Sequence, residues 1–524
     1  MGYPNYKPDA LFRLIKALTR NEKRYFRLFI SRERNRKSKK YLHLFEIIDR
    51  QKGYEKKDIR SLYEKTVRSK NLTDSKYHLH RLLLKVLHFY HSGSSVDSRL
   101  HERMHYSEIL AGKGLFEDSK EEINMARKIA WKHDKYPEIL NLSYRDARLL
   151  LVTGFNNVAT PTIEAIEKES LSALQKLKNI FDFLSINLKV FHNSSREGPE
   201  VRNEEEMKKK YEIINHPLHK SEENAITFRA RIYYYQSLGH SLDGVGKPEK
   251  SYEIYKRALA FIESSEKWSK EVIGDYTSVL FNLIIQCIAL RKYEEVIIYI
   301  QISKSIPDRF PRKYISESLH TRILSNSYMC ELQMYFDTGA FEKGAALNEK
   351  IEEIISRFLP HLRKHDPLVF FSLLCTCNFG AGKYAVALKY LNKVLNYPHK
   401  EIREDIRSFS RIMILILHYE MGNTGILEYA IRSTYRYLYK RGRLYKAEKI
   451  ILEFIRKELM NVLPGQDLKD AFFRLKEKLE PLTRDPYEKD AFVYLDYVSW
   501  LESKITGLPF ADIIREKASQ KEQG

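Results

Sequence analysis

The chain has 524 residues, a hydrophobic fraction of 43% and a formal charge of +21, from 90 Lys and Arg against 69 Asp and Glu. This length exceeds what one compact core accommodates, so several domains or a repeat array are expected. The 35 Tyr and 26 Phe provide ample apolar surface for packing, which excludes global disorder. The charge favours an acidic partner, whether nucleic acid, an anionic membrane face or an acidic protein. The alternative is a lysine-rich solvated surface without such a partner.

The start of the chain predicts no targeting segment. The opening MGYPNYKPDALFRLIK lacks an apolar core of signal-peptide length, and Tyr6 stands where a myristoylation motif needs Ser or Thr. The most apolar run, 279–290, is too short to span a bilayer. We therefore expect a cytoplasmic protein without a transmembrane segment.

The first section, residues 1–95, is predicted to be a basic helical section. Its apolar residues recur at three- and four-residue steps, which is typical of helices. The expected helices run from Pro8 and Asp9 to residue 18, then over 20–31, 41–50 and 56–67, and from a cap at Asp74 or Ser75 to about residue 90. Thr19 and Glu22 form a capping box, in which the two side chains satisfy free amides at a helix start.

A basic cluster spans residues 13–40. The stretch 32–40 (RERNRKSKK) is expected to be a charged loop or a frayed helix end, and Glu22 and Glu33 are the only acids of the cluster. Guanidinium and ammonium groups bind phosphates and carboxylates, so the cluster is a candidate anion-binding site. Its candidate residues on the second helix are Arg20, Lys23, Arg24 and Arg27.

From residue 96 onward a turn glycine recurs at intervals of roughly 40–48 residues, which is typical of stacked helical hairpins. The members are Gly114, Gly154, Gly198, Gly246, Gly339, Gly382 and Gly422, with Arg291 as one substituted member. In the clearest hairpins a ring follows the glycine at +2 and a small residue follows at +5, as in Gly114, Phe116 and Ser119, or Gly382, Tyr384 and Ala387. Glycine permits the turn, and the small residues let two helix backbones approach closely.

These residues resemble the tetratricopeptide repeat over about 96–396, best at 238–259 and 371–395 and weakly between 153 and 224. The resemblance implies an α-solenoid of helical hairpins over 96–400, continued by C-terminal hairpins over 401–524. The units are longer than that family's usual 34 residues, so the solenoid is expected to be irregular. The chain is also similar to a group of bacterial helical proteins without an assigned activity, on segments such as LIKALTRNEKRYF (14–26) and EYAIRSTYRYL (428–438).

Three further segments carry predictions. Residues 194–210 (SSREGPEVRNEEEMKKK) are expected to form a long exposed turn, and the tail from Ile514 is expected to fray. Residues 243–247 (DGVGK) resemble a phosphate loop only superficially, because Pro248 replaces the hydroxyl residue and no strand precedes. They are expected to be a hairpin turn.

A second basic and aromatic cluster lies near residue 440. On a helix, Arg432, Tyr435, Arg436 and Tyr439 share one side, and Arg443 follows them. The stripe is a candidate anion-binding or partner-binding surface, since rings stack on bases and on guanidinium groups. In the alternative interpretation the tyrosines pack between hairpins and the arginines pair with acids of the neighbouring helix.

His101, Glu102 and His105 match the H-E-x-x-H pattern of zinc proteases, in which histidines four residues apart on one helix face hold Zn²⁺ and the glutamate acts as a base. The pattern also arises by chance in a chain with 17 His and many Glu, and no strand is predicted to build a substrate cleft. The four cysteines (Cys287, Cys330, Cys375 and Cys377) lack metal-ligand spacing and are expected to be buried thiols. No catalytic set, metal or cofactor is predicted.

Three classes of function remain open. The leading hypothesis is a non-enzymatic scaffold that binds a protein or peptide in the concave face of the helical repeats, an inference that rests largely on fold analogy. The second is a helical-repeat protein that binds RNA or DNA through its basic N-terminal helices. The third is a metallohydrolase at His101, Glu102 and His105. The oligomeric state is left open.

Overall fold

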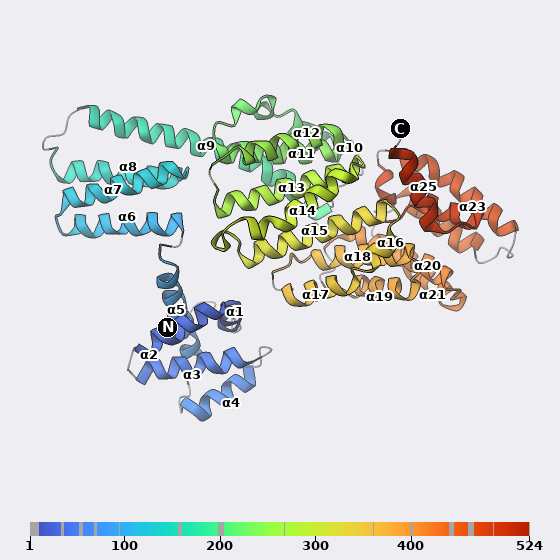
Figure 1. The fold of residues 1–524 in the computed structure, drawn as a ribbon, viewed down its shortest axis with the longest axis horizontal. Coiled ribbons are helices and arrows are strands. Elements are labelled where there is room, and N and C mark those ends of the chain that lie inside the picture. The colour runs from blue at the N-terminus through green and yellow to red at the C-terminus, as the bar shows by residue number, and fades with distance from the viewer. Residues whose placement is uncertain are drawn as a thin grey trace. The chain divides into compact units, whose positions relative to one another are not determined.

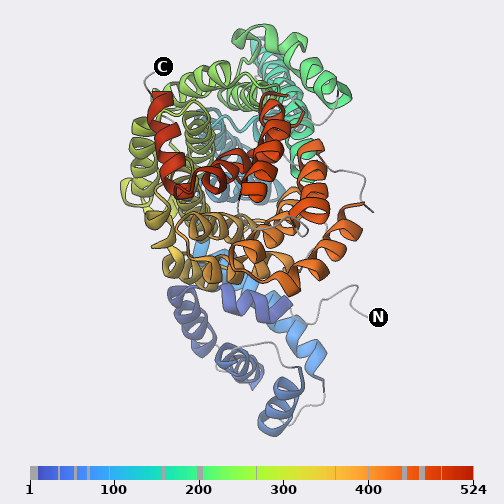
Figure 2. The same cartoon turned by 90° about the vertical axis from the view of Figure 1, so that its right-hand side faces the viewer.

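A computed structural model describes most of the chain, and every regular element within its described residues is a helix (Figures 1 and 2). The predicted all-α class is therefore confirmed. The described residues are 10–32, 36–51, 56–67, 71–93, 95–155, 160–197, 204–266, 268–359, 361–398, 402–439, 445–459, 466–485 and 487–522.

The helices follow one another with short connections. In the first part of the chain they are α1 (Ala10–Ala17), α2 (Arg20–Arg32), α3 (Arg36–Arg50), α4 (Lys56–Val67), α5 (Leu72–His91), α6 (Val96–Gly112), α7 (Phe116–Lys132), α8 (Tyr136–Val152) and α9 (Thr160–Glu197). They continue as α10 (Glu204–Ile214), α11 (Phe228–Gly244), α12 (Pro248–Glu263), α13 (Lys270–Ala289), α14 (Tyr293–Arg309), α15 (Glu317–Asp337), α16 (Phe341–Ala345) and α17 (Asn348–Phe358). The last helices are α18 (Asp366–Gly380), α19 (Tyr384–Leu395), α20 (Glu404–Glu420), α21 (Thr424–Tyr439), α22 (Lys446–Phe454), α23 (Gln466–Leu479), α24 (Tyr497–Thr506) and α25 (Phe510–Glu522).

The chain divides into two compact units, residues 1–174 and 175–524. The division falls inside α9, whereas the sequence suggested boundaries at 95 and 400. Helix α9 is 38 residues long and runs through the region where the repeat pattern is weakest. The expected exposed turn at 194–210 is wrong for most of its length, because α9 continues to Glu197 and α10 begins at Glu204.

Helices α1–α5 form a bundle with its own hydrophobic core. The core consists of Leu11, Ile15, Leu18, Phe26, Ile30, Leu44, Phe45, Ile48, Ile59, Tyr63, Leu79, Leu83 and Val86. The structure confirms helices α2 and α4 close to their predicted bounds. Two predictions were wrong in detail: α3 begins at Arg36 within the charged stretch, and α5 is capped by Asn71 rather than by Asp74 or Ser75.

The turn glycines adopt the left-handed conformation that the repeat pattern predicted. Positive φ values occur at Gly114, Gly154, Gly246, Gly339, Gly382 and Gly422, while Gly198 lies outside the described residues. Arg291 also has a positive φ, 58°, so it does occupy the position of a turn glycine. The Lys292 amide donates to the Cys287 carbonyl at 2.8 Å, the bond that Lys383 makes to Asn378 after Gly382. Segment 243–247 is likewise the predicted turn, between α11 and α12.

Small residues bring neighbouring helices into close contact, as expected. The Ser119 hydroxyl donates to the Ser107 carbonyl at 2.7 Å, which joins α7 to α6. The Ser251 hydroxyl donates to the Gly239 carbonyl at 2.8 Å, which joins α12 to α11. A Cβ added at Gly380 in α18 would lie 2.3 Å from the Phe341 ring. At such crossings even one methyl group has no room.

The C-terminal helices pack back onto earlier elements, which sequence periodicity did not reveal. Phe510 at the start of α25 stacks on Phe341 with ring centroids 5.5 Å apart, and the Arg515 guanidinium donates to the Gly339 carbonyl at 3.1 Å. Ile514 is buried in the same core. The tail was expected to fray from Ile514, and this was wrong because α25 docks on an earlier turn.

Helix α13 is long and apolar enough to cross a membrane by composition alone, and it is the only described helix that meets those criteria. Most of the apolar run 279–290 that the sequence singled out lies in this longer helix, which has 20 residues. However, 56% of its most apolar window is buried, with Val279, Leu280 and Leu283 inside the core. This is the pattern of a core helix, and the described residues contain no clear transmembrane segment. All four cysteines are buried and carry free thiols, as predicted.

Candidate functional site

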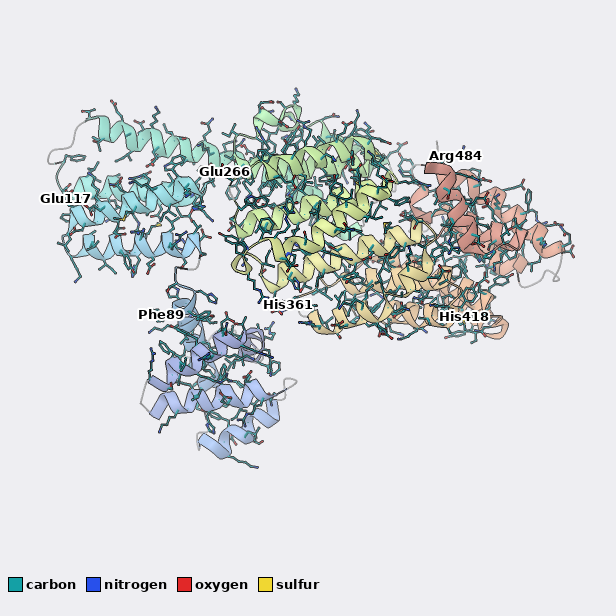
Figure 3. The ribbon with its side chains drawn as sticks, viewed as in Figure 1. Phe89, Glu117, Glu266, His361, His418 and Arg484 are labelled. Carbon is teal, nitrogen blue, oxygen red and sulfur yellow. The ribbon has the colours of Figure 1, made fainter. Side chains whose placement is uncertain are left out.

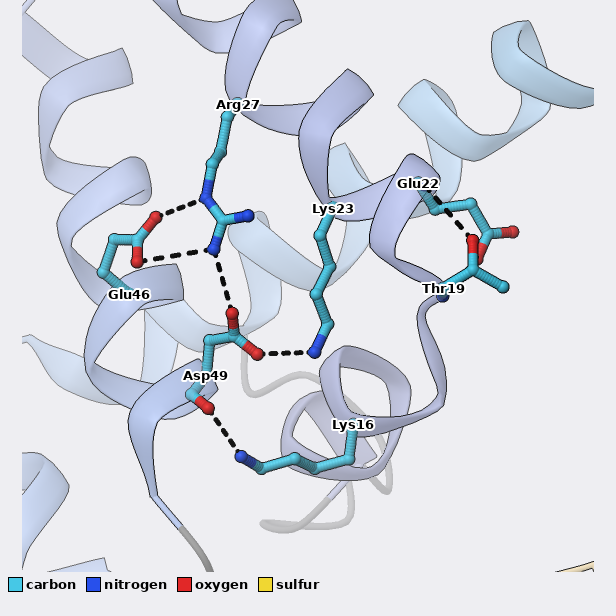
Figure 4. A network of polar contacts seen from close by, with 7 residues as sticks. All are labelled: Lys16, Thr19, Glu22, Lys23, Arg27, Glu46 and Asp49. Atoms are coloured by element: carbon cyan, nitrogen blue, oxygen red, sulfur yellow. Dashed lines mark hydrogen bonds and ion pairs between the residues drawn. The ribbon is translucent and has the colours of Figure 1, made fainter.

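Two of the four candidate cations on α2 form ion pairs with acids of the N-terminal bundle (Figure 4). The Lys23 ammonium lies 2.6 Å from one Asp49 oxygen, and Arg27 contacts Glu46 at 2.7 Å and Asp49 at 2.9 Å. The hydrogen bonds that Arg27 donates to the Glu46 carboxylate raise the pKa of Arg27, although partial burial acts in the opposite direction. Residues 13–40 contain only two acids, whereas the carboxylates that pair with Lys23 and Arg27 lie farther along the chain, on α3. Lys23 and Arg27 therefore tie α2 to α3.

The capping box at the start of α2 is confirmed. The Thr19 backbone amide donates to the Glu22 carboxylate at 2.7 Å, and the Glu22 amide donates to the Thr19 hydroxyl at 3.3 Å. Glu22 also lies 2.8 Å from the His91 ring nitrogen of α5. Burial opposes ionisation of Glu22, but its hydrogen bonds from Thr19 and His91 lower its pKa. This acid is therefore occupied within the bundle.

The other two candidates on α2 point to solvent. Arg20 and Arg24 are exposed, and so is Arg32. Within the part of the chain that the structure describes, none of the three forms an ion pair. Each four-residue step along a helix turns by about 40°, so the three guanidinium groups follow a slowly winding strip of the exposed surface of α2. The structure thus divides the cluster into cations that form ion pairs within the bundle, Lys23 and Arg27, and exposed cations, Arg20, Arg24 and Arg32.

The second basic and aromatic cluster is partly described. Arg432, Tyr435 and Arg436 are exposed on α21, which confirms that they share a side. The Arg456 guanidinium lies over the Tyr435 ring at 5.3 Å, so this ring is already covered by a cation of the same chain. The side chain of Tyr439 and all of Arg443 lie outside the described residues. The contact at Tyr435 favours the packing interpretation for that ring, whereas the role of the arginines stays a prediction.

The H-E-x-x-H residues lie on the exposed side of α6. His101, Glu102 and His105 all face solvent. Glu102 accepts a hydrogen bond from Tyr106 at 2.7 Å, and His105 lies 4.0 Å from Glu108. Across the described residues, no three His, Cys, Asp or Glu side chains are grouped to hold a metal ion. The arrangement offers no enclosed site for metal chemistry.

A row of charged side chains, which the sequence did not reveal, lies on or just before the first helices of successive hairpins in residues 175–524. It begins with Arg229 of α11, which forms an ion pair with Asp275 of α13. Burial raises the pKa of Asp275 to about 6, although Arg229 and Arg322 act in the opposite direction. The next member is Arg322 of α15. Each of these helices thus contributes a charged residue within its first two turns.

Arg322 is the arginine of the row that forms no ion pair within the described residues. It is partly buried, and one guanidinium nitrogen donates to the Gly274 carbonyl at 3.3 Å. No carboxylate oxygen of the described residues lies within 4.0 Å of it. Burial and the neighbouring Arg363 lower its pKa, although Asp275 raises it. A guanidinium has five donors, so Arg322 retains several for an added acceptor.

The row continues towards α20. Arg363 donates to Asp366 at 2.9 Å and to Asn326 at 2.8 Å. His361, labelled in Figure 3, lies two residues before Arg363. Farther on, Arg403 pairs with Asp405 at 2.6 Å. In contrast to Arg322, these two arginines have carboxylate partners.

The members of the row are regularly spaced in the sequence. Its members are Arg229, Asp275, Arg322, Arg363 and Arg403, separated by 46, 47, 41 and 40 residues. This interval resembles that of the turn glycines. Charged residues at other positions have similar spacings by chance, so the row is recognised only once the helices are placed. No protein-family model matches the chain, and a comparison with curated proteins gives no match either.

Proposed function

We propose that the chain is a non-enzymatic cytoplasmic scaffold whose helical hairpins, arranged as an irregular tetratricopeptide-like solenoid, bind a protein or peptide partner. The turn glycines, the substituted turn at Arg291 and the close helix crossings support the hairpin array. Stacked hairpins offer an extended surface on which a partner's side chains bind at several points.

The observation that carries this proposal is the incomplete pairing of Arg322. Partly buried charges are usually paired, because a low-dielectric surrounding makes an unpaired charge costly. Asp275 is committed to Arg229, and Asp366 is committed to Arg363. A carboxylate supplied by a partner would give the Arg322 guanidinium the acidic partner that it lacks. We therefore expect the partner segment to be acidic at the position that contacts α15.

The proposal is tested with a fluorescein-labelled hexaglutamate peptide, amidated at its C-terminus, and a hexaglutamine peptide as its neutral counterpart. We expect the full chain to bind hexaglutamate more tightly, and Arg322→Gln to weaken that binding about tenfold, since a charged hydrogen bond is lost. The matched control is Arg257→Gln, which removes an exposed arginine that pairs with Glu222. Equal affinity of the two variants would contradict the assigned role of Arg322.

Stability provides a second measurement. Arg322 is crowded by Arg363, so Arg322→Gln is expected to leave the melting temperature unchanged or higher. A residue retained only for folding would give the opposite result. Weak peptide binding together with lost stability would therefore reassign Arg322 to a structural role.

A further inference from the structure

The charge of the chain is concentrated in its first 93 residues. They hold 24 Lys and Arg against nine Asp and Glu, a formal charge of +15 out of the +21 of the whole chain. The remaining 431 residues hold 66 Lys and Arg against 60 Asp and Glu, a formal charge of +6. The excess is therefore a property of the α1–α5 bundle and its flanking residues. A local excess of this size is typical of surfaces that bind a polyanion.

The acids of the bundle are already engaged. Among its described carboxylates, Glu46 and Asp49 pair with cations of α2, Glu22 contacts Thr19 and His91, and Glu64 pairs with Arg60. Asp74 accepts a hydrogen bond from Asn71 at the start of α5. None of these acids is left to neutralise the exposed arginines of α2.

The exposed arginines form an ordered row. Arg20, Arg24, Leu28 and Arg32 follow one another at four-residue steps along α2, and all four are exposed. Each step turns by about 40°, so the side chains follow a strip that winds slowly around the exposed side of the helix. At a rise of 1.5 Å per residue, Arg20 and Arg32 are about 18 Å apart along the helix axis. This length suits contacts with several successive phosphates of one strand. We call these three arginines the α2 arginine row.

Aromatic rings border the row. On α2, Tyr25 and Phe29 come directly after Arg24 and Leu28, and each contacts a ring of α5. Phe29 stacks on Phe89 with ring centroids 6.4 Å apart, and 47% of Phe89 remains exposed. Phe89 is labelled on α5 in Figure 3. The exposed part of the Phe89 ring is available for stacking with a base.

We propose that the α1–α5 bundle binds single-stranded nucleic acid, with phosphates on the α2 arginine row and a base stacked on Phe89. This function goes beyond the scaffold proposal and depends on different residues. A bilayer fits less well, because a helix that inserts into the interface exposes its apolar face, whereas Phe26 and Ile30 of α2 are buried in the bundle core. An acidic protein fits the charge but gives Phe89 no specific role.

The test uses the full chain and fluorescein-labelled 20-nucleotide probes of mixed sequence: single-stranded RNA, single-stranded DNA and duplex DNA. Fluorescence anisotropy is measured at several salt concentrations from 50 to 200 mM. We expect both single strands to bind more tightly than the duplex. Changing Arg20, Arg24 and Arg32 together to Gln should weaken single-strand binding at least about tenfold and make the logarithmic salt slope shallower by about 2, because three phosphate contacts are lost.

The matched control changes Arg99, Arg148 and Arg312 to Gln. These arginines are exposed and lie outside the bundle, so the control lowers the net charge by the same amount. It should retain the affinity and the salt slope. Equal losses in the two triple variants would overturn the α2 arginine row as the site. If the glutamine variant misfolds by circular dichroism, a triple Arg→Lys variant replaces it and should keep the salt slope.

Phe89 is tested by Phe89→Leu, which keeps an apolar side chain and removes the ring. We expect at least about fivefold weaker single-strand binding with an unchanged salt slope, since stacking involves no counterion release. Unchanged affinity would overturn the stacking role. Absence of nucleic-acid binding at 50 mM salt, or tighter binding to the duplex, would overturn the proposal. Binding to phosphatidylserine vesicles without nucleic-acid binding would reassign the row to a membrane.

Discussion

The N-terminal bundle and the helical hairpins of residues 175–524 use charged and small residues in opposite ways. In the bundle, cations outnumber carboxylates by 24 to nine over residues 1–93, and the hydrophobic core consists of Leu, Ile, Val, Phe and Tyr side chains. In the hairpins, most of the charged row is paired, and glycine, alanine and serine occupy the helix crossings. We infer that the bundle tolerates packing changes better, while the hairpins tolerate surface-charge changes better.

Gly380→Ala tests whether the hairpins are sensitive to changes in packing. The added Cβ would lie 2.3 Å from the Phe341 ring, so α16 and α18 must move apart. We expect the free energy of unfolding of residues 175–524 to fall by about 3 kcal/mol, the upper range for overpacking. The control is Gly425→Ala in α21, where nothing lies within 4 Å. Urea denaturation that gives equal midpoints for both variants would refute the close crossing.

A pH experiment addresses the buried acids of the hairpins. Burial raises the pKa of Asp337 to about 7, although Gln333 and Arg291 act in the opposite direction. Because the folded state binds the proton more tightly than the unfolded state, stability falls as pH rises from about 4 to about 7. A rise of about three pKa units corresponds to about 4 kcal/mol, which we halve because Asp337 is only partly buried. We expect Asp337→Asn to be more stable than the wild type by about 2 kcal/mol at pH 8 and equal to it near pH 4. A constant difference across pH would contradict the raised pKa.

A pair of variants tests the division of the α2 cations into those that form ion pairs and those that are exposed. Asp49→Asn removes the charge that holds Lys23 and Arg27, so we expect a loss of about 1–2 kcal/mol. Arg24→Gln removes an exposed cation and should change stability by less than about 0.5 kcal/mol. Hydrogen–deuterium exchange of the α2 amides measures both. Equal effects would show that the two groups are not distinct.

The smallest expected effect concerns the substituted turn. Arg291 has a φ of 58°, a strained conformation for a residue with a Cβ. Arg291→Gly should relieve this strain, partly offset by the greater freedom of glycine in the unfolded chain, for a net gain of about 0.5 kcal/mol. The melting temperature should rise slightly. A fall would show that the Arg291 side chain stabilises the turn by more than the strain it imposes.

The sequence by itself determined the helical class, the turn positions and the capping box at the start of α2. These features depend on residues close together in the chain. Thr19 and Glu22 are three residues apart, and the left-handed turn at Arg291 follows from the interval of the turn glycines. Local patterns suffice because a cap or a turn is satisfied within one or two helical turns.

Only the tertiary structure decided which charges are free. Lys23 and Arg24 are neighbours in the sequence, yet one is bonded to Asp49, 26 residues away, and the other faces solvent. Likewise, Arg322 stands out only after Asp275 has been paired with Arg229, and α25 docks on a turn 176 residues before Arg515. Ion pairing and docking depend on distances in space, which periodicity along the chain does not specify.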